Sequence, residues 1–148
     1  MKNHAKLARF SLFIACLGSI SLCSCSSSEP VSYADGTYEG RSLDHTSDSD
    51  GNGAGYATCS LTIKESKIEK CTFLLYELDG TLKDENYGID NSKENYLKAQ
   101  KAVQAATQYA KQLVEKNDLD GVKVISGATI TFTEFQEAVD DALSKAKA

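Results

Sequence analysis

The sequence predicts an α+β domain in which a small antiparallel sheet packs against a long, alanine-rich helix and a C-terminal helix. Three observations support this fold class. Two neighbouring segments alternate apolar and polar residues with a period of two, as strands of a half-buried sheet do. A later, longer segment repeats its apolar residues at helical spacing, and a second helical pattern follows near the end of the chain. Strands that are followed by helices, rather than interleaved with them, are typical of α+β domains.

The first element is a predicted lipoprotein signal peptide over residues 1–24. Three basic residues and no acid precede the apolar run FSLFIACLGSISLC. This run is shorter than the roughly 20 residues that a membrane-spanning helix needs, so it is typical of a secretory signal. The stretch SLCSCSSSEP then resembles a bacterial lipoprotein processing site, with Leu22 three residues before Cys25. The resemblance implies cleavage before Cys25, a lipid on its sulfur and a tether over residues 25–34. The alternative is an ordinary secretory signal.

The rest of the chain, residues 35–148, has the length of one domain. The whole sequence has 148 residues, 41% of them hydrophobic, and 21 acidic residues against 16 basic ones. Since three of the basic residues belong to the predicted signal peptide, the remaining chain is more acidic still. It has no basic stripe, so we expect no nucleic-acid partner.

The strands are predicted from residues 35 to 76. DGTYEG, residues 35–40, indicates a turn and a short strand, and a polar, glycine-rich loop follows over residues 44–55. YATCSLTI, residues 56–63, alternates apolar and polar side chains, and IEKCTFLLY, residues 68–76, returns after the turn KESK. The residues expected on the buried face of this hairpin are Ala57, Cys59, Leu61, Ile63, Cys71, Phe73 and Leu75.

Two cysteines of the domain, Cys59 and Cys71, lie at similar distances from the predicted turn. They are therefore expected to be cross-strand neighbours. If the signal peptide directs the chain out of the cytosol, a disulfide between them is permitted. Two small, buried core residues without a covalent bond are an equally good interpretation.

The helices are predicted over the second half of the domain. The first runs roughly from Ser92 to Lys116, and Asn91 and Glu94 have the spacing of a capping box. A narrow stripe of apolar residues follows its length, with many alanines that favour close packing on the sheet. VKVI, residues 122–125, is predicted as a short strand, and the last helix starts near Thr131. The stripe consists of Tyr96, Ala99, Val103, Ala106, Ala110 and Leu113.

Calcium binding and hydrolysis are poorly supported by the sequence. The loop residues Asp48, Asp50, Asn52 and Gly53 match early positions of an EF-hand, but Cys59 occupies the position of its bidentate Glu. A solvated loop is the better interpretation. Ser126 lacks the preceding glycine of a nucleophile elbow, and the domain's one histidine, His45, lies in the same loop. We therefore predict no catalytic and no metal-ligating residue.

The segment SGAT, Ser126–Thr129, lies at the predicted junction of a strand and a helix. Thr131 and Glu134 have the spacing of a capping box, so a helix N-terminus is expected just after Thr129. The free N–H groups and positive dipole end of such a terminus favour a phosphate. Gly127 and Ala128 allow a ligand to approach the backbone closely. An ordinary capped turn is the alternative.

These segments in this order resemble the FMN-binding domain family. The resemblance rests on DGTYEG, the glycine-rich loop, the hairpin, the alanine-rich helix and VISGATITF, and it covers about Asp35 to Ala146. The family includes flavin-bearing subunits of sodium-pumping NADH:quinone reductases and lipoproteins of extracellular electron transfer in Gram-positive bacteria. The resemblance implies FMN as the cofactor, joined to Thr129 through a phosphoester. A flavin transferase would make this bond from FAD, with magnesium, and release AMP.

The resemblance also assigns roles to other residues. The loop around the attachment residue consists of Ser126, Gly127 and Ala128, while Thr131 holds the phosphate or caps the helix. Asn86 and Tyr87 are expected near the flavin ring. The expected function is that of a membrane-anchored, extracytoplasmic electron carrier rather than a stand-alone enzyme. Its expected partners are the flavin transferase and membrane redox proteins.

One position departs from the family's pattern. The attachment motif usually has an Asp three residues before the Ser, but this chain has Lys123, and the nearest acid is Asp120. The departure leaves an alternative open, in which the lipoprotein binds FMN or another small ligand without a covalent bond. In a third interpretation the domain makes only protein contacts, and SGAT is no more than a turn.

Overall fold

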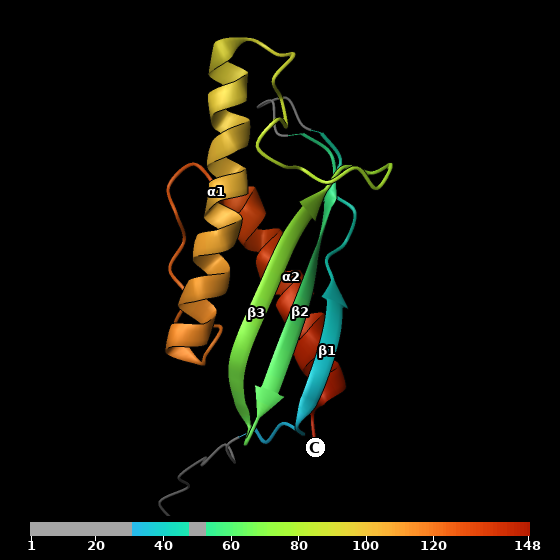
Figure 1. The fold of residues 1–148 in the computed structure, drawn as a ribbon, viewed down its shortest axis with the longest axis vertical. Helices are drawn as coiled ribbons and strands as arrows, with labels where there is room; N and C mark the ends of the chain where they lie inside the picture. Colours follow the sequence, from blue (N-terminus) through green and yellow to red (C-terminus); the bar gives the residue numbers. More distant parts are fainter. Residues whose placement is uncertain (1–30, 48–52) are drawn as a thin grey trace, which may run out of the picture.

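The computed structural model describes residues 31–47 and 53–148 and contains three strands followed by two helices. The strands form one antiparallel sheet in the order β1-β2-β3. One helix, α1, lies along β3, and the other, α2, crosses behind β1 and β2 (Figure 1). The predicted α+β fold is therefore confirmed. The elements are β1 (Gly36–Arg41), β2 (Tyr56–Lys64), β3 (Lys67–Tyr76), α1 (Lys93–Lys116) and α2 (Thr129–Ala146).

Some of the sequence predictions fall outside the described residues. These are the signal peptide, the lipidated Cys25 and most of its tether, and the loop residues Asp48, Asp50 and Asn52. Within residues 31–47 and 53–148, no helix combines the length and the apolar character that crossing a membrane requires.

The hairpin of β2 and β3 is formed as predicted. The residues of β2 alternate between buried and half-buried, so only one face of the sheet is covered. The turn contains Glu65 and Ser66, whose φ angles of 51° and 59° lie in the left-handed region. Two such residues match the right-handed twist of a hairpin. All four predicted core residues of β2 are buried, as are Phe73 and Leu75 of β3.

The two cysteines on this hairpin are not bonded to each other. Cys59 lies opposite Phe73, and Cys71 lies opposite Leu61, so the two thiols are diagonal neighbours on the covered face. Their sulfur atoms are 3.8 Å apart, well beyond the roughly 2.05 Å of a disulfide. The structure therefore agrees with the interpretation without a covalent bond: Cys59 is buried in the core, and the half-buried Cys71 packs against it.

The helix α2 touches the sheet most closely at Gly40 of β1. A Cβ atom at this position would collide with the carbonyl oxygen of Ala138 and lie 2.6 Å from the amide nitrogen of Ala142. Both atoms belong to the backbone of α2, so only glycine allows this approach.

Side chains of α2 also cover the free edge of the sheet. Asp141 accepts a hydrogen bond from the backbone N–H of Arg41 at 2.9 Å, and Lys145 donates to the carbonyl of Glu39 at 2.7 Å. Lys145 and Asp141 form an ion pair at 2.8 Å as well. Two backbone groups of the β1 edge are thus bonded within the domain, which disfavours pairing of this edge with another chain.

The N-terminus of α1 differs slightly from the prediction. Its cap is Ser92, whose hydroxyl accepts a hydrogen bond from the N–H of Asn95 at 3.3 Å. The predicted cap, Asn91, belongs instead to the turn before the helix, where its N–H donates to the carbonyl of Gly88. The capping box of Asn91 and Glu94 is therefore wrong by one residue.

The C-terminus of α1 is tied to the sheet through Asn117. This residue adopts a left-handed backbone with φ of 53°, and its N–H donates to the carbonyl of Leu113 at 2.8 Å. Its side-chain amide bonds both backbone groups of Ile68 in β3, at 2.7 and 3.1 Å. One asparagine thus ends the helix and fixes the start of the strand beside it.

The predicted strand at residues 122–125 is absent. This segment runs alongside α1, and its polar groups bond side chains of the helix instead of another strand (Figure 1). Gln112 bonds both the N–H and the carbonyl of Lys123, at 2.8 and 3.3 Å, and the hydroxyl of Tyr109 accepts from the N–H of Ile125 at 2.9 Å. Val122 is buried in the core and Ile125 packs against it, whereas Val124 is exposed, so the apolar pattern of VKVI does not reflect membership of the sheet.

The segment before β1 meets the C-terminal residues at one end of the sheet. Tyr33 forms an isolated antiparallel bridge with Lys147. The N–H of Ala34 donates to the carbonyl of Ala146 at 2.8 Å, and the N–H of Ala148 donates to the carbonyl of Ser32 at 3.1 Å. This end of the sheet is the one at which β1 begins (Figure 1).

Candidate functional site

The start of α2 is the first part of the candidate site. The helix begins at Thr129, and its cap is Ala128, which makes no side-chain capping bond. The first helical backbone bond runs from the N–H of Phe132 to the carbonyl of Ala128, at 3.0 Å. The N–H groups of residues 129–131 therefore point out of the end of the helix, where the dipole is positive.

The predicted capping box of Thr131 and Glu134 is wrong. Both side chains lie inside the helix and are buried, each only 4% exposed. The chain turns into the helix earlier than predicted because Gly127 takes a left-handed conformation, with φ of 78°. This leaves the helix without a side-chain cap and its first amides free to bind a ligand.

The loop before α2 is held by Tyr109 of α1. The hydroxyl of this fully buried residue accepts a hydrogen bond from the N–H of Ile125 and donates one to the carbonyl of Ala128, at 2.9 and 3.1 Å. Its ring packs against Phe132 and Phe135 of α2, with centroids 5.2 and 5.5 Å away. The Ser126–Thr129 loop is thus positioned by the core and not by its own sequence alone.

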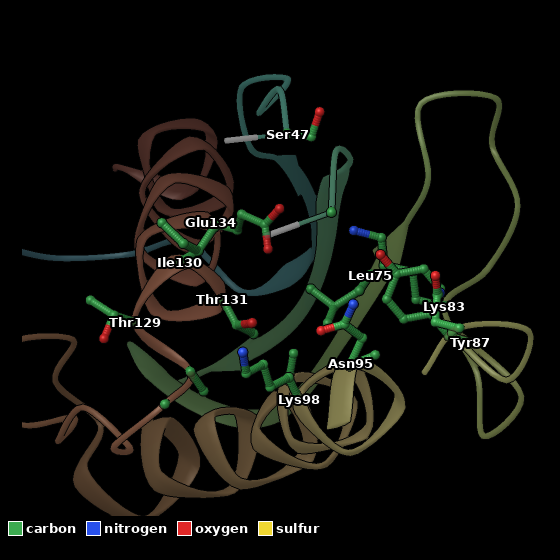
Figure 2. Close-up of a pocket in the computed structure, with 17 residues that line it drawn as sticks. Ser47, Leu75, Lys83, Tyr87, Asn95, Lys98, Thr129, Ile130, Thr131 and Glu134 are labelled. Atoms are coloured by element: carbon green, nitrogen blue, oxygen red, sulfur yellow. The ribbon is translucent and has the colours of Figure 1, made fainter. Parts of the chain in front are cut away.

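A cavity of about 750 Å³ opens beside this loop. Its volume lies in the range of roughly 300–1,000 Å³ that is common for small-molecule and cofactor sites. It lies between the first turns of α2, the N-terminal half of α1 and the segment that leads from β3 to α1 (Figure 2). The residues that line it include Gly127, Ala128, Thr129, Ile130, Thr131, Glu134, Asn95, Lys98, Ala99, Ala102, Lys83 and Tyr87.

Most of the site residues predicted from the sequence lie along this cavity. Gly127, Ala128, Thr129 and Thr131 line it, whereas Ser126 lies on the exposed side of the turn. Thr129 is exposed, and Thr131 is buried. Of the two residues expected near a ring, Tyr87 lines the cavity and Asn86 does not.

Two lysines of α1 lie near the end of the cavity at SGAT, and one of them, Lys98, lines it and also pairs with Glu94 at 3.2 Å. Figure 2 shows the ammonium group of Lys98 directed toward Thr131. Lys101 lies over Gly127, because a Cβ atom on that glycine would be 2.8 Å from the lysine nitrogen. Together with the free amides of α2, these ammonium groups form an environment that favours an anion such as a phosphate.

Further from SGAT, Glu134 of α2 faces Lys83 and Tyr87, which lie across the cavity on the segment after β3 (Figure 2). The nitrogen of Lys83 lies 5.0 Å from the centroid of the Tyr87 ring, a cation–π contact. Lys83 is 8% exposed, and this burial lowers the pKa of its ammonium group, against the opposing effect of the Glu134 and Glu77 charges. Burial also raises the pKa of the Tyr87 hydroxyl.

Burial shifts the pKa of Glu134 in the direction opposite to that of Lys83. Burial raises the pKa of its carboxyl, while the charges of Lys83 and His45 lower it and that of Glu137 raises it. His45 and Glu137 form a polar pair next to it, with 2.9 Å between Nε2 and Oε2. This part of the cavity therefore contains several titratable groups whose pKa values depend on burial and on one another's charges.

Sequence reasoning missed Lys83, Lys98 and Glu134 as site residues. Glu134 had a signal, because it follows Thr131 by three residues and precedes Ala138 by four, which places all three on one face of a helix. Lys83 had none. It is buried because the chain folds back after β3, where the N–H of Lys83 donates to the carbonyl of Leu75 at 2.8 Å.

The comparisons with known proteins concern the family and the fold of the chain. Residues 53–144, more than half of the chain, match the sequence model of a family described as FMN-binding domain. The structure resembles a crystal structure of the CPE2226 protein from Clostridium perfringens, with a TM-score of 0.57 and 21% sequence identity. The match covers 77% of this chain and 88% of that one, and it shows a shared fold. A comparison with curated proteins gave no match.

Proposed function

Because the chain belongs to the FMN-binding domain family, we propose that it is a membrane-anchored, extracytoplasmic electron carrier with FMN in the cavity beside α2. The observation that carries the proposal is that Gly127, Ala128 and Thr129 of the SGAT loop line a cavity with cofactor dimensions. The same loop presents free helix amides, and two lysines lie beside it. This arrangement suits a ligand with a phosphate at one end.

The described residues fit both parts of FMN. The phosphate would bind at the first amides of α2, with Lys98 and Lys101 as counter-charges. The isoalloxazine ring would extend into the cavity toward Tyr87, whose aromatic face offers a stacking surface. The hydroxyl of Thr131, which is buried and lines the cavity, would donate a hydrogen bond to the phosphate.

We propose Thr129 as the attachment residue. Its exposed position leaves its hydroxyl accessible to a flavin transferase. In the transfer, the Thr129 oxygen bonds the phosphorus of the FMN half of FAD, the pyrophosphate bond of FAD breaks, and AMP leaves. The hydroxyl proton passes to a base of the transferase or to water. Ser126 and Gly127 shape the turn that presents Thr129.

Bound FMN supplies the capacity to accept and release one or two electrons, which the chain's own side chains lack. The cavity residues bind and orient the cofactor and restrict water around it. A lipid on Cys25 would keep the carrier beside membrane redox proteins, which donate and accept its electrons. Outside the membrane, a covalent bond would also prevent loss of the cofactor by diffusion.

The direct test is intact mass and in-gel flavin fluorescence of the chain produced together with a flavin transferase. We expect the mass of one FMN less one water, and fluorescence that persists in a denaturing gel. Thr129→Ala should lose both signals. The matched control is Thr133→Ala, which removes an exposed hydroxyl one turn further along α2 that donates to the Thr129 carbonyl at 3.3 Å. Covalent flavin on Thr129→Ala, or its absence from the unsubstituted chain, would contradict the attachment.

A second candidate is non-covalent FMN binding, and Lys123 favours it. This residue replaces the acid that is usual three residues before the Ser, and its side chain is exposed beside the loop. Lys123→Asp should raise the flavinylation yield if the transferase recognises an acid there. Denaturation separates the candidates, because only covalent flavin stays with the unfolded chain. Flavin that is released by urea from the unsubstituted chain would support the non-covalent form.

A further inference from the structure

Two charged residues of the cavity are unusual in the domain. Among all residues that the structure describes, Lys83 and Glu134 are the only charged ones that are buried, at 8% and 4% exposure. Lysine and glutamate are rarely buried unless they serve an interaction, because an interior position disfavours their charged forms. Both line the cavity, and their side chains come from segments that are far apart in the sequence.

Their placement is fixed by the fold. Lys83 is anchored by its backbone bond to Leu75, and its nitrogen lies 2.5 Å from where a Cβ atom on Gly55 would be. Figure 2 shows the Lys83 amine extending across the cavity toward α2, on the level of Glu134. A charge that is held in place before a ligand binds acts on that ligand without further rearrangement.

We propose that Lys83 and Glu134 set the reduction potential of the bound flavin, with opposite effects. This inference rests on the proposed function. Bound FMN would gain a net negative charge when it takes two electrons from a membrane redox protein and one proton from solvent. The Lys83 ammonium stabilises that charge and so favours the reduced flavin, while the Glu134 carboxylate opposes it and limits the effect.

Other charged groups also act on Lys83 and Glu134. Glu77 acts on Lys83 and Tyr87, and His45 and Glu137 act on Glu134 from the side of the cavity nearest the loop after β1. The two residues named in the proposal are the buried ones, so water screens their charges least.

The test is the midpoint potential of the flavin-loaded chain, measured by redox titration at neutral pH. Lys83→Met should weaken the preference for reduced over oxidised flavin by about tenfold or more, which lowers a two-electron midpoint by about 30 mV. Glu134→Gln should raise the midpoint, and Lys83→Arg should keep it close to the original value. The matched control is Lys111→Met, which removes an exposed charge from α1 and should leave the midpoint unchanged.

The outcomes separate this inference from the proposed function. A chain that holds no flavin at all would overturn the proposed function and the inference with it. A flavin-loaded chain in which Lys83→Met and Glu134→Gln both match the Lys111→Met control would overturn the inference alone. Shifts in the same direction for both variants would also overturn it, since a general disturbance of the cavity does not depend on the sign of the lost charge. Should Lys83→Met fail to fold, Lys83→Gln, which also removes the charge, takes its place in the comparison with Glu134→Gln.

Discussion

The hydroxyl of Tyr109 donates a hydrogen bond to the carbonyl of Ala128, the residue that caps α2, at a distance of 3.1 Å. The same hydroxyl accepts from the N–H of Ile125. One buried side chain of α1 thus satisfies two backbone groups of the loop that carries Thr129. The position of the proposed attachment residue therefore depends on helix packing.

Tyr109→Phe removes both hydrogen bonds and leaves two backbone groups without these partners. We expect the free energy of unfolding to fall by about 1–3 kcal/mol, measured by urea denaturation, and the yield of covalent flavin to fall with it. Tyr96→Phe is the control, because its hydroxyl also donates to a backbone carbonyl, that of Glu85 at 3.0 Å, but on an exposed loop. Equal losses in the two variants would argue against a special role for Tyr109.

Gly40→Ala tests the contact between α2 and the sheet. The added methyl group would collide with the backbone of α2, so the helix must move away from β1. Overpacking of this kind costs about 1–3 kcal/mol, which thermal or urea denaturation would detect. Gly121→Ala, where the nearest atom is a side-chain carbon at 3.2 Å, should cost less. Unchanged stability of Gly40→Ala would mean that the approach of α2 is looser than the structure indicates.

The stability of the flavin-free chain should depend on pH through Glu134. Burial raises the pKa of its carboxyl in the folded chain above that in the unfolded chain, so the folded chain holds this proton more tightly. The stabilising contribution is therefore complete below the unfolded pKa and is lost as pH rises through the folded pKa. In urea denaturation at a series of pH values, Glu134→Gln should show a smaller decline over this interval. An identical decline would assign the effect to other groups.

Lys83 contributes with the opposite sign at higher pH. Since burial lowers the pKa of its ammonium group, stability should rise as pH increases through that lowered value.

The double variant Lys83→Met/Glu134→Gln removes both buried charges at once. Burial disfavours the charged form of both side chains, so we expect the flavin-free double variant to be at least as stable as the original chain. Lower stability of the double variant than of either single variant would contradict this expectation.

The two cysteines should differ in reactivity. Cys59 is 1% exposed, and its hydrogen bond with Cys71, together with burial, raises the pKa of its thiol. Since the thiolate is the reactive form, iodoacetamide should modify the more exposed Cys71 first, and peptide mass mapping would identify the site. Resistance of both cysteines until a reductant is added would instead indicate a disulfide in the native protein.

The fold could largely be predicted because its main elements follow simple periodicities. The alternation in β2 and the helical spacing in α1 and α2 each reflect one covered face, and the sequence carries that information locally. The strand predicted at residues 122–125 was wrong for a different reason. Its backbone partners are side chains of the preceding helix, Gln112 and Tyr109, and no local pattern reveals that they will replace a neighbouring strand.

The site was predictable only in part for the same reason. The SGAT motif and the helix pattern that follows it are enough to indicate a phosphate-binding turn. The helix nevertheless starts at Thr129, because Gly127 and the contact from Tyr109 set the turn earlier than the capping pattern suggested. The burial of Lys83 depends on the return of the chain beside β3, which is a property of the folded domain and not of the residues around it.

The pairing of Tyr33 with Lys147 has a consequence for the reach of the proposed carrier. That pairing closes the end of the sheet nearest the tether, whereas the cavity lies at the other end, where β3 finishes (Figure 1). A strand of 10 residues spans about 33 Å, so a cofactor in the cavity would stand roughly that far above the point where the tether joins the domain. With a lipid on Cys25, the end of the domain that joins the tether would lie next to the membrane, and the end with the cavity would face away from it. Tether length would then decide which donors and acceptors come within electron-transfer distance.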